Sequence, residues 1–135
     1  MSNAGILNNL KELVVKEKEK YKELSNGCSN FIFTLNEEKE KYRVLSNYYP
    51  DFIFTINDIL FAIEELEKPK ENRTMSSLFI FDSIKKLIRG EKERYLQLLK
   101  YKRYARIQPI LQEFISFLDN VLSYFEQLEK EEFSR

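Results

Sequence analysis

The sequence contains no histidine and no tryptophan, and its 135 residues include only one cysteine, three glycines and three prolines. Without histidine, the chain lacks the commonest general base and metal ligand. A zinc site would need several carboxylates beside Cys28, which is an unusual ligand set. The three glycines are isolated from one another, so no glycine-rich phosphate-binding loop is present. These absences argue against an enzyme, and we expect neither a cofactor nor a metal.

The shortage of glycine and proline also argues against a β-sandwich or barrel, which needs many tight turns. No apolar run approaches the roughly 18 residues of a membrane span, and no signal-peptide pattern opens the chain. A lone cysteine excludes an internal disulfide framework and is typical of a reducing compartment. We therefore expect a cytoplasmic protein that does not enter membranes. Its single domain covers residues 1–135, of which residues 1–4 resemble the remnant of a cleaved tag.

The spacing of apolar residues predicts an all-α fold, a five-helix bundle with a long C-terminal amphipathic helix. The clearest pattern ends the chain, where apolar residues alternate at steps of four and three and therefore share one helical face. Further apolar residues widen this stripe, so the last helix should have more than one neighbour. The predicted helices span residues 5–24, 30–46, 51–67, 77–106 and 108–132. The candidates for the core or for a subunit interface are Phe52, Ile107, Leu111, Phe114, Leu118, Val121, Phe125 and Leu128.

Turn-forming residues set the predicted helix ends. Ser25-Asn26-Gly27 predicts a stop after the first helix, because glycine tolerates the left-handed conformation that follows many helices. Gly90 weakens the fourth helix by roughly 1 kcal/mol relative to alanine, which favours a bend or break there. Pro109 has no N–H to donate and predicts a kink or break between the last two helices.

An internal repeat with a period of 21 residues relates residues 18–36 to residues 39–57, and 12 of the 19 aligned positions are identical. Each copy predicts the end of one helix, a Ser-Asn turn and the start of the next helix. The candidate N-caps are Ser29 or Asn30 in the first copy and Asp51 in the second. Two units are too few for a solenoid. A duplicated helix corner is therefore the favoured interpretation, with a repeated binding unit as the alternative.

The net charge is zero, but the charges are unevenly distributed. Residues 85–106 contain nine basic and two acidic side chains, whereas the chain from Glu113 onward contains six acidic and two basic ones. The basic segment is either a surface for phosphates or an acidic partner, or an ordinary helix face paired with the acids of the next helix. Its candidate binding residues are Lys85, Lys86, Arg89, Arg94, Lys100, Lys102, Arg103 and Arg106.

Tyrosine and phenylalanine are abundant, with 19 residues in all. Many fall outside any single helical stripe. Because aromatic residues concentrate at the centres of interfaces, this surplus predicts contacts between subunits in a homo- or hetero-oligomer. Filling of the chain's own core is the competing explanation.

Two segments resemble the helical domain of the GINS replication proteins. Leu45-Ser-Asn-Tyr-Tyr-Pro-Asp-Phe52, followed by a helical pattern, is similar to the corner that joins two helices of that family. The stretch from Glu93 to Ile107, with Arg103 and Arg106, is similar to its basic signature, and residues 122–133 resemble its acidic helix end. The small β domain usually joined to these helices is absent, and the 21-residue duplication is not a feature of the family.

The resemblance implies a non-catalytic scaffold subunit that joins components of a DNA replication helicase complex. It places Arg103, Arg106 and Ile107 in the basic signature and Phe52 in the helix corner. The alternative hypothesis is a helical module that binds nucleic acid, or regulates a protein partner, through residues 85–106. Both hypotheses predict a protein that acts by binding.

Overall fold

A computed structural model describes the backbone of residues 3–31 and 36–134 and the side chains of residues 3–28 and 39–134. The described chain is all-helical. It contains four long helices, α1 (Asn3–Phe31), α2 (Asn36–Glu67), α3 (Ser77–Leu98) and α4 (Gln108–Phe133). Two short 3₁₀ helices, η1 (Lys70–Asn72) and η2 (Lys102–Ile107), lie in the connections before α3 and α4. The described residues contain no strand.

The prediction of five helices was wrong, because two of the predicted turns lie inside continuous helices. The predicted second helix, residues 30–46, is instead divided between α1, which ends at Phe31, and α2, which begins at Asn36. α1 starts before residue 5 and runs through Ser25-Asn26-Gly27 to Phe31, so Ser29 and Asn30 lie within it. Gly27 does not have the positive φ of a helix-ending glycine. The stripe of buried residues explains this continuity, because Tyr21 and Cys28 are both buried and lie seven residues, or two turns, apart. Packing of Cys28 therefore favours the helical conformation over the turn.

The second predicted corner also lies inside a helix, since α2 runs without interruption through Pro50 and Asp51. Proline in a helix interior removes one backbone hydrogen bond and costs about 3 kcal/mol. The apolar spacing nevertheless continues across it at alternating steps of four and three. The buried residues of this stripe are Leu45, Tyr49, Phe52, Ile56, Ile59, Ile63 and Leu66. Their shared burial on one face offsets the cost of the proline.

The two copies of the repeat lie mostly on different helices, and their aligned positions are only partly alike in burial. Cys28 in α1 and Tyr49 in α2 are an aligned pair, and both are buried. Leu24 and Leu45 are another, but Leu24 is 42% exposed whereas Leu45 is buried. Phe-Ile-Phe-Thr at residues 52–55 is helical, as predicted. The prediction for its first copy falls mostly on residues 32–34, which lie outside the described residues.

The predicted helix over residues 77–106 is too long. α3 continues through Gly90 without a break but ends at Leu98. Between Tyr95 and Ile107 no side chain is fully buried, and Leu98, Leu99 and Tyr104 pack only partly against the core, so the buried stripe of α3 ends at Tyr95. The chain reverses here, and α4 then begins at Gln108. Pro109 lies in the first turn of α4, where its missing N–H costs no hydrogen bond.

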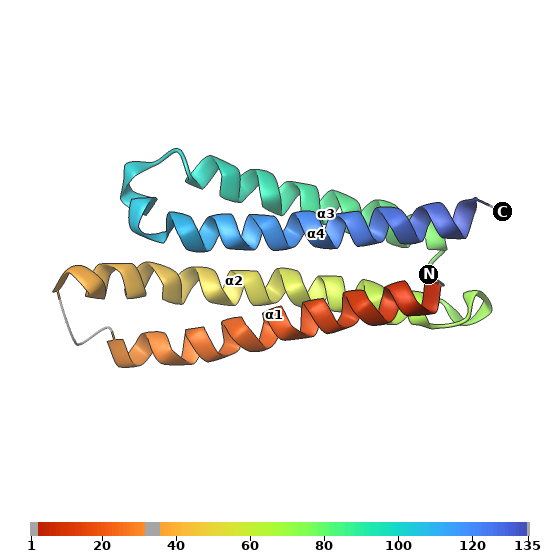
Figure 1. The fold of residues 1–135 in the computed structure, drawn as a ribbon, viewed down its shortest axis with the longest axis horizontal. Helices are drawn as coiled ribbons and strands as arrows, with labels where there is room; N and C mark the ends of the chain where they lie inside the picture. Colours follow the sequence, from red (N-terminus) through yellow and green to blue (C-terminus); the bar gives the residue numbers. More distant parts are fainter. Residues whose placement is uncertain (1–2, 32–35, 135) are drawn as a thin grey trace.

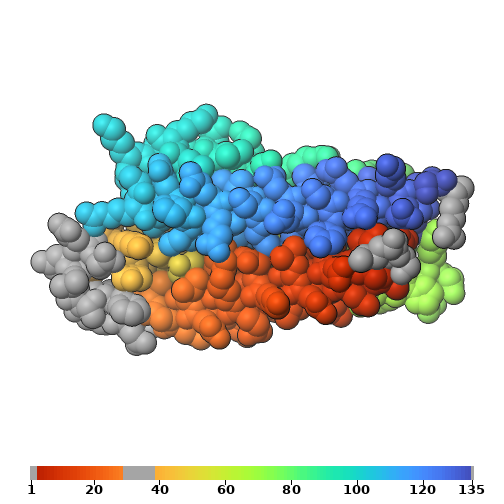
Figure 2. All heavy atoms as spheres, in the orientation of Figure 1, coloured from red at the N-terminus to blue at the C-terminus, as the bar shows by residue number. Residues whose placement is uncertain are grey.

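The four helices form an up-down bundle in which consecutive helices are antiparallel (Figure 1). α1 packs along α2, α3 packs along α4, and α1 also contacts α4, which is visible along the face shown in Figure 2. The two chain ends lie at one end of the bundle, and η2 lies at the other, where α1 ends and α2 begins. Aromatic rings fill the centre: the Phe52 and Phe114 rings stack 4.0 Å apart, and Tyr21 and Tyr95 contact both.

Arg73 links the connection between α2 and α3 to the C-terminal end of α4. Its guanidinium donates hydrogen bonds to the Leu66 and Lys68 carbonyl oxygens, to Ser77 Oγ, and to Glu132 Oε1 at 2.8 Å. Both side chains of the Arg73–Glu132 pair are less than a tenth exposed. Burial alone would raise the pKa of Glu132, but the hydrogen bonds from Arg73 and Ser77 outweigh it, and the pKa lies below its usual value.

Candidate interaction surfaces

The apolar stripe of the last helix lies in the core of the single chain. All eight residues predicted as core or interface are buried against helices of the same molecule. They therefore leave no exposed seam for a partner. The abundant aromatic residues fall into two groups, one in the chain's own core and one on its surface. Phe52 and Phe114 fill the core, whereas Phe54, Phe61 and Phe79 are each more than half exposed.

Four of the five basic residues on α3 form ion pairs that bind this helix to its neighbours. Lys85 Nζ lies 2.6 Å from Glu129, Lys92 Nζ lies 2.6 Å from Asp119, and both acids are on α4. Arg89 lies 3.8 Å from Glu126 of α4, and Arg94 lies 3.0 Å from Asp51 of α2. The pKa of Arg94 is raised, because hydrogen bonding to Asp51 outweighs the effect of burial. The acidic helix α4 therefore pairs with three of these four cations, and α2 pairs with the fourth.

Lys86 differs from its neighbours on α3. It is exposed, and no acidic side chain pairs with it among the described residues. It lines a depression next to a groove between α2 and α3, and Phe79 and Ser83 line both. Asp58 stands on the α2 side of this groove, also exposed and also without an ion pair in the described structure. Two unpaired charges of opposite sign thus flank one groove from its two sides.

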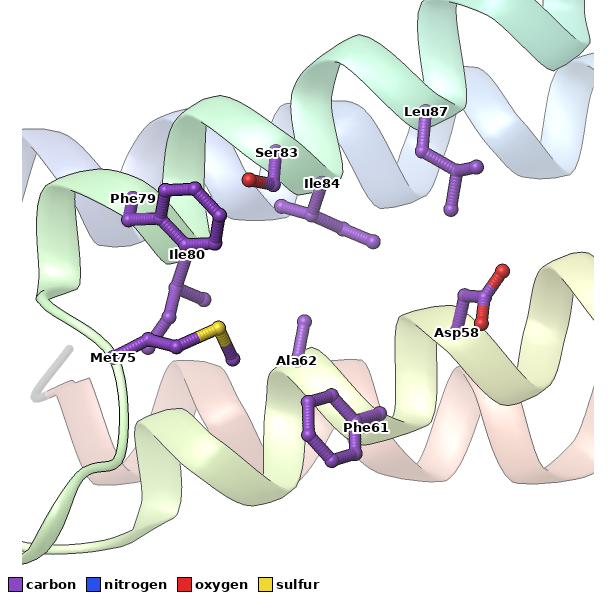
Figure 3. Close-up of a pocket in the computed structure, with 9 residues that line it drawn as sticks. All are labelled: Asp58, Phe61, Ala62, Met75, Phe79, Ile80, Ser83, Ile84 and Leu87. Carbon is purple, nitrogen blue, oxygen red and sulfur yellow. The ribbon is translucent and has the colours of Figure 1, made fainter.

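The groove is mostly apolar and has a volume of about 360 Å³. Figure 3 shows Ala62 of α2 opposite Ile84 of α3, with Met75 at one end of the groove, while the Phe61 ring lies along α2. Phe61 is 54% exposed and Phe79 is 56% exposed. Phe54, one heptad before Phe61 on α2, is 69% exposed and extends the apolar surface along that helix. The residues that line the groove are Asp58, Phe61, Ala62, Met75, Phe79, Ile80, Ser83, Ile84 and Leu87.

The remaining predicted basic residues gather in the connection between α3 and α4, at one end of the bundle. Lys100, Lys102, Arg103 and Arg106 are all exposed there. The Arg103 guanidinium lies 4.9 Å from the centre of the Tyr104 ring and 5.9 Å from that of Tyr101. The structure thus separates the predicted basic segment into a paired part on α3 and this exposed end.

Tyr48 of α2 joins this end to the bundle. Its ring meets the Tyr104 ring edge-on at 6.0 Å and the buried Tyr95 ring at 6.4 Å. Burial, reinforced by a hydrogen bond with Tyr104, raises the pKa of Tyr48 to about 12. Tyr48 therefore stays neutral at physiological pH. The contacts hold Tyr104 in place while the basic side chains around it face solvent.

The described residues contain no group of three or more His, Cys, Asp or Glu side chains placed to hold a metal ion. None of the described helices is both long enough and apolar enough to cross a membrane. Asp58, Phe61 and Phe79 were not predicted as site residues from the sequence. A signal for Phe61 was present in the sequence, since Phe54 and Phe61 lie seven residues apart and off the buried stripe of α2.

Comparisons of the chain with family models, with curated proteins and with solved structures found no match. No family is therefore shown for this chain, and nothing in these comparisons identifies a GINS subunit.

Proposed function

We propose that the protein is a non-catalytic helical assembly module and that its α2–α3 groove binds the same groove of a second copy. The observation that carries the proposal is the exposure of Phe61 and Phe79, which line this groove, and of Phe54, one heptad before Phe61 on α2. Exposed apolar patches that are contiguous and flanked by charges mark interaction sites more often than isolated apolar residues do. Phenylalanine rings that enter a partner's groove would supply the buried apolar contacts on which association depends.

Charge complementarity supports a second copy as the occupant. A two-fold axis that runs along the groove places α2 of one copy over α3 of the other and keeps residues at the same height along the bundle. Asp58 lies at the height of Leu87 (Figure 3), and Lys86 is the residue before Leu87 in the sequence. Each Asp58 would therefore meet Lys86 of the other copy, and the symmetry would form this ion pair twice. Both groups lack an ion pair within the described single chain.

The exposed area of the phenylalanine rings limits the expected affinity of the proposed dimer. A phenylalanine buries about 150–250 Å² when fully covered. At the observed exposures, three rings from each copy contribute roughly 700 Å² in total. This is below the roughly 1,200 Å² of a standard stable interface, even before smaller contributions from Met75 and Leu87. We therefore expect a reversible dimer with a dissociation constant in the micromolar range rather than a permanent one.

Analytical ultracentrifugation of charge-reversal variants tests the proposal. Asp58→Lys or Lys86→Asp alone places like charges opposite each other and should weaken the dimer about fivefold to tenfold. The double variant restores opposite charges and should dimerise nearly as well as the original chain. Glu12→Lys and Lys16→Asp on α1 are matched controls, since both side chains are exposed and outside the groove. Equal weakening by the controls, or no rescue in the double variant, would refute the two-fold arrangement.

A narrower proposal, a GINS-like scaffold in a replication helicase complex, depends on the resemblance alone. The two segments that resemble the family differ in their structural setting. The expected corner at Leu45 to Phe52 lies within α2, whereas Arg103 and Arg106 are exposed. Biolayer interferometry against a purified MCM helicase tests the narrower proposal. Binding that is lost on reversal of Arg103 would support it, and no binding would contradict it without affecting the proposed dimer.

A further inference from the structure

The connection between α3 and α4 alternates basic residues with tyrosines. Its sequence is Lys-Tyr-Lys-Arg-Tyr-Ala-Arg over residues 100–106, with four cations and no acid in seven residues. Most of this stretch belongs to η2. Figure 2 shows it near one end of the molecule. The proposed dimer does not use this segment.

Three of the four cations in this segment, Lys100, Lys102 and Arg103, form none of the ion pairs described above for α3. Lys100 and Lys102 are exposed and have no ion pair among the described residues. The described contacts of the Arg103 side chain are with the Tyr101 and Tyr104 rings rather than with a carboxylate. Like charges this close in sequence repel one another. An anion that binds Lys100, Lys102 and Arg103 together would be attracted to all three and would also reduce the repulsion between them.

Tyr101 adds an exposed aromatic surface to these charges. Its ring is 55% exposed and meets the Tyr104 ring edge-on at 6.4 Å, with an angle of 81° between the planes. Tyr104 is in turn held by Tyr48 of α2. The Tyr101 ring is thus supported from one side by other tyrosines and remains accessible from solvent.

We propose that residues 100–106 bind single-stranded nucleic acid. Bases would stack on Tyr101, and backbone phosphates would pair with Lys100, Lys102 and Arg103. Proteins that bind single strands without sequence preference combine cations along the backbone with aromatic rings under the bases. A duplex fits less well, because its bases are already stacked and its grooves are entered by a long helix or a β-ribbon. The short 3₁₀ connection at the end of the bundle provides neither.

Fluorescence anisotropy with a labelled oligothymidylate of about 20 nucleotides tests the proposal. Affinity should fall with salt at a slope of about −0.7 per phosphate contact, or roughly −2 for three contacts. The double variant Lys100→Ser/Lys102→Ser should bind about tenfold more weakly. The control Lys16→Ser/Lys130→Ser removes the same number of exposed charges from other parts of the surface and should change affinity less than about twofold. Equal weakening by the two double variants would overturn the assigned site, since only overall charge would then matter.

A Tyr101→Leu variant separates stacking from charge attraction. Leucine keeps an apolar side chain but removes the ring, and the oligonucleotide should bind at least about fivefold more weakly. Circular dichroism should show unchanged helix content in every variant, because these side chains are exposed. Unchanged affinity of Tyr101→Leu would overturn the stacking contact. Tighter binding of a duplex of the same length, or of vesicles rich in phosphatidylserine, would overturn the assignment to single strands.

Discussion

The Gly27→Ala variant tests the continuity of α1, the point on which the structure and the sequence pattern disagree most. Gly27 has the negative φ of a helical residue, and a Cβ atom added to it would meet nothing within 4 Å. Alanine is favoured over glycine in a helix interior by about 1 kcal/mol. Since nothing opposes the new methyl group, the free energy of unfolding should rise by nearly that amount. For a chain of 135 residues, we expect the midpoint of thermal unfolding to rise by roughly 3–5 °C.

A decrease in the free energy of unfolding of Gly27→Ala would refute the continuous helix. If Gly27 ended a helix in the left-handed conformation, alanine would be strained there and would lower stability by about 1 kcal/mol. Circular dichroism melts of both proteins at the same concentration distinguish the two results. Gly90→Ala is the matched control, because Gly90 lies in α3 and also has nothing within 4 Å of an added Cβ. The two variants should be stabilised to a similar extent.

Two further predictions concern the core and the end of the bundle. Phe114→Ala should lower the free energy of unfolding by about 3–5 kcal/mol, because the ring is fully buried and stacks on Phe52. A urea titration measures this change, and a loss below about 1 kcal/mol would contradict the stacked centre. Because the pKa of Glu132 is lowered in the folded state, its ionised form stabilises the fold above about pH 4.5, and this contribution is lost as the pH falls through the folded value. Glu132→Gln should therefore be less stable than the original chain at pH 7, and the difference should shrink on acidification; a pH-independent difference would contradict the linkage.

Much of the helical architecture follows from spacing alone. The stripe from Ile107 to Leu128 is buried along one face of α4, because alternating steps of four and three keep apolar residues together. The number of helices was predicted wrongly, because local turn residues received more weight than the longer pattern of apolar spacing. At Gly27 and Pro50 the apolar spacing continues through residues that usually end or kink helices. Burial of Cys28, Tyr49 and Phe52 outweighs these local preferences.

The interaction surfaces were only partly predictable. The basic composition of residues 85–106 is evident in the sequence, but the pairing of Lys85 with Glu129 depends on how α3 and α4 lie side by side. Only the structure separates these paired cations from the exposed Lys100 and Lys102. The groove was not predictable from either helix separately, since Phe61 on α2 and Phe79 on α3 are brought together by tertiary packing.

Light scattering coupled to size-exclusion chromatography tests the proposed self-association most directly. For the unmodified chain, the molar mass should rise with concentration from 16.3 kDa toward twice that value. The Phe61→Asp variant should stay at the monomer mass, because an unpaired charge would be buried in the interface. A mass of 16.3 kDa for the unmodified chain at every concentration up to about 1 mM would contradict the account.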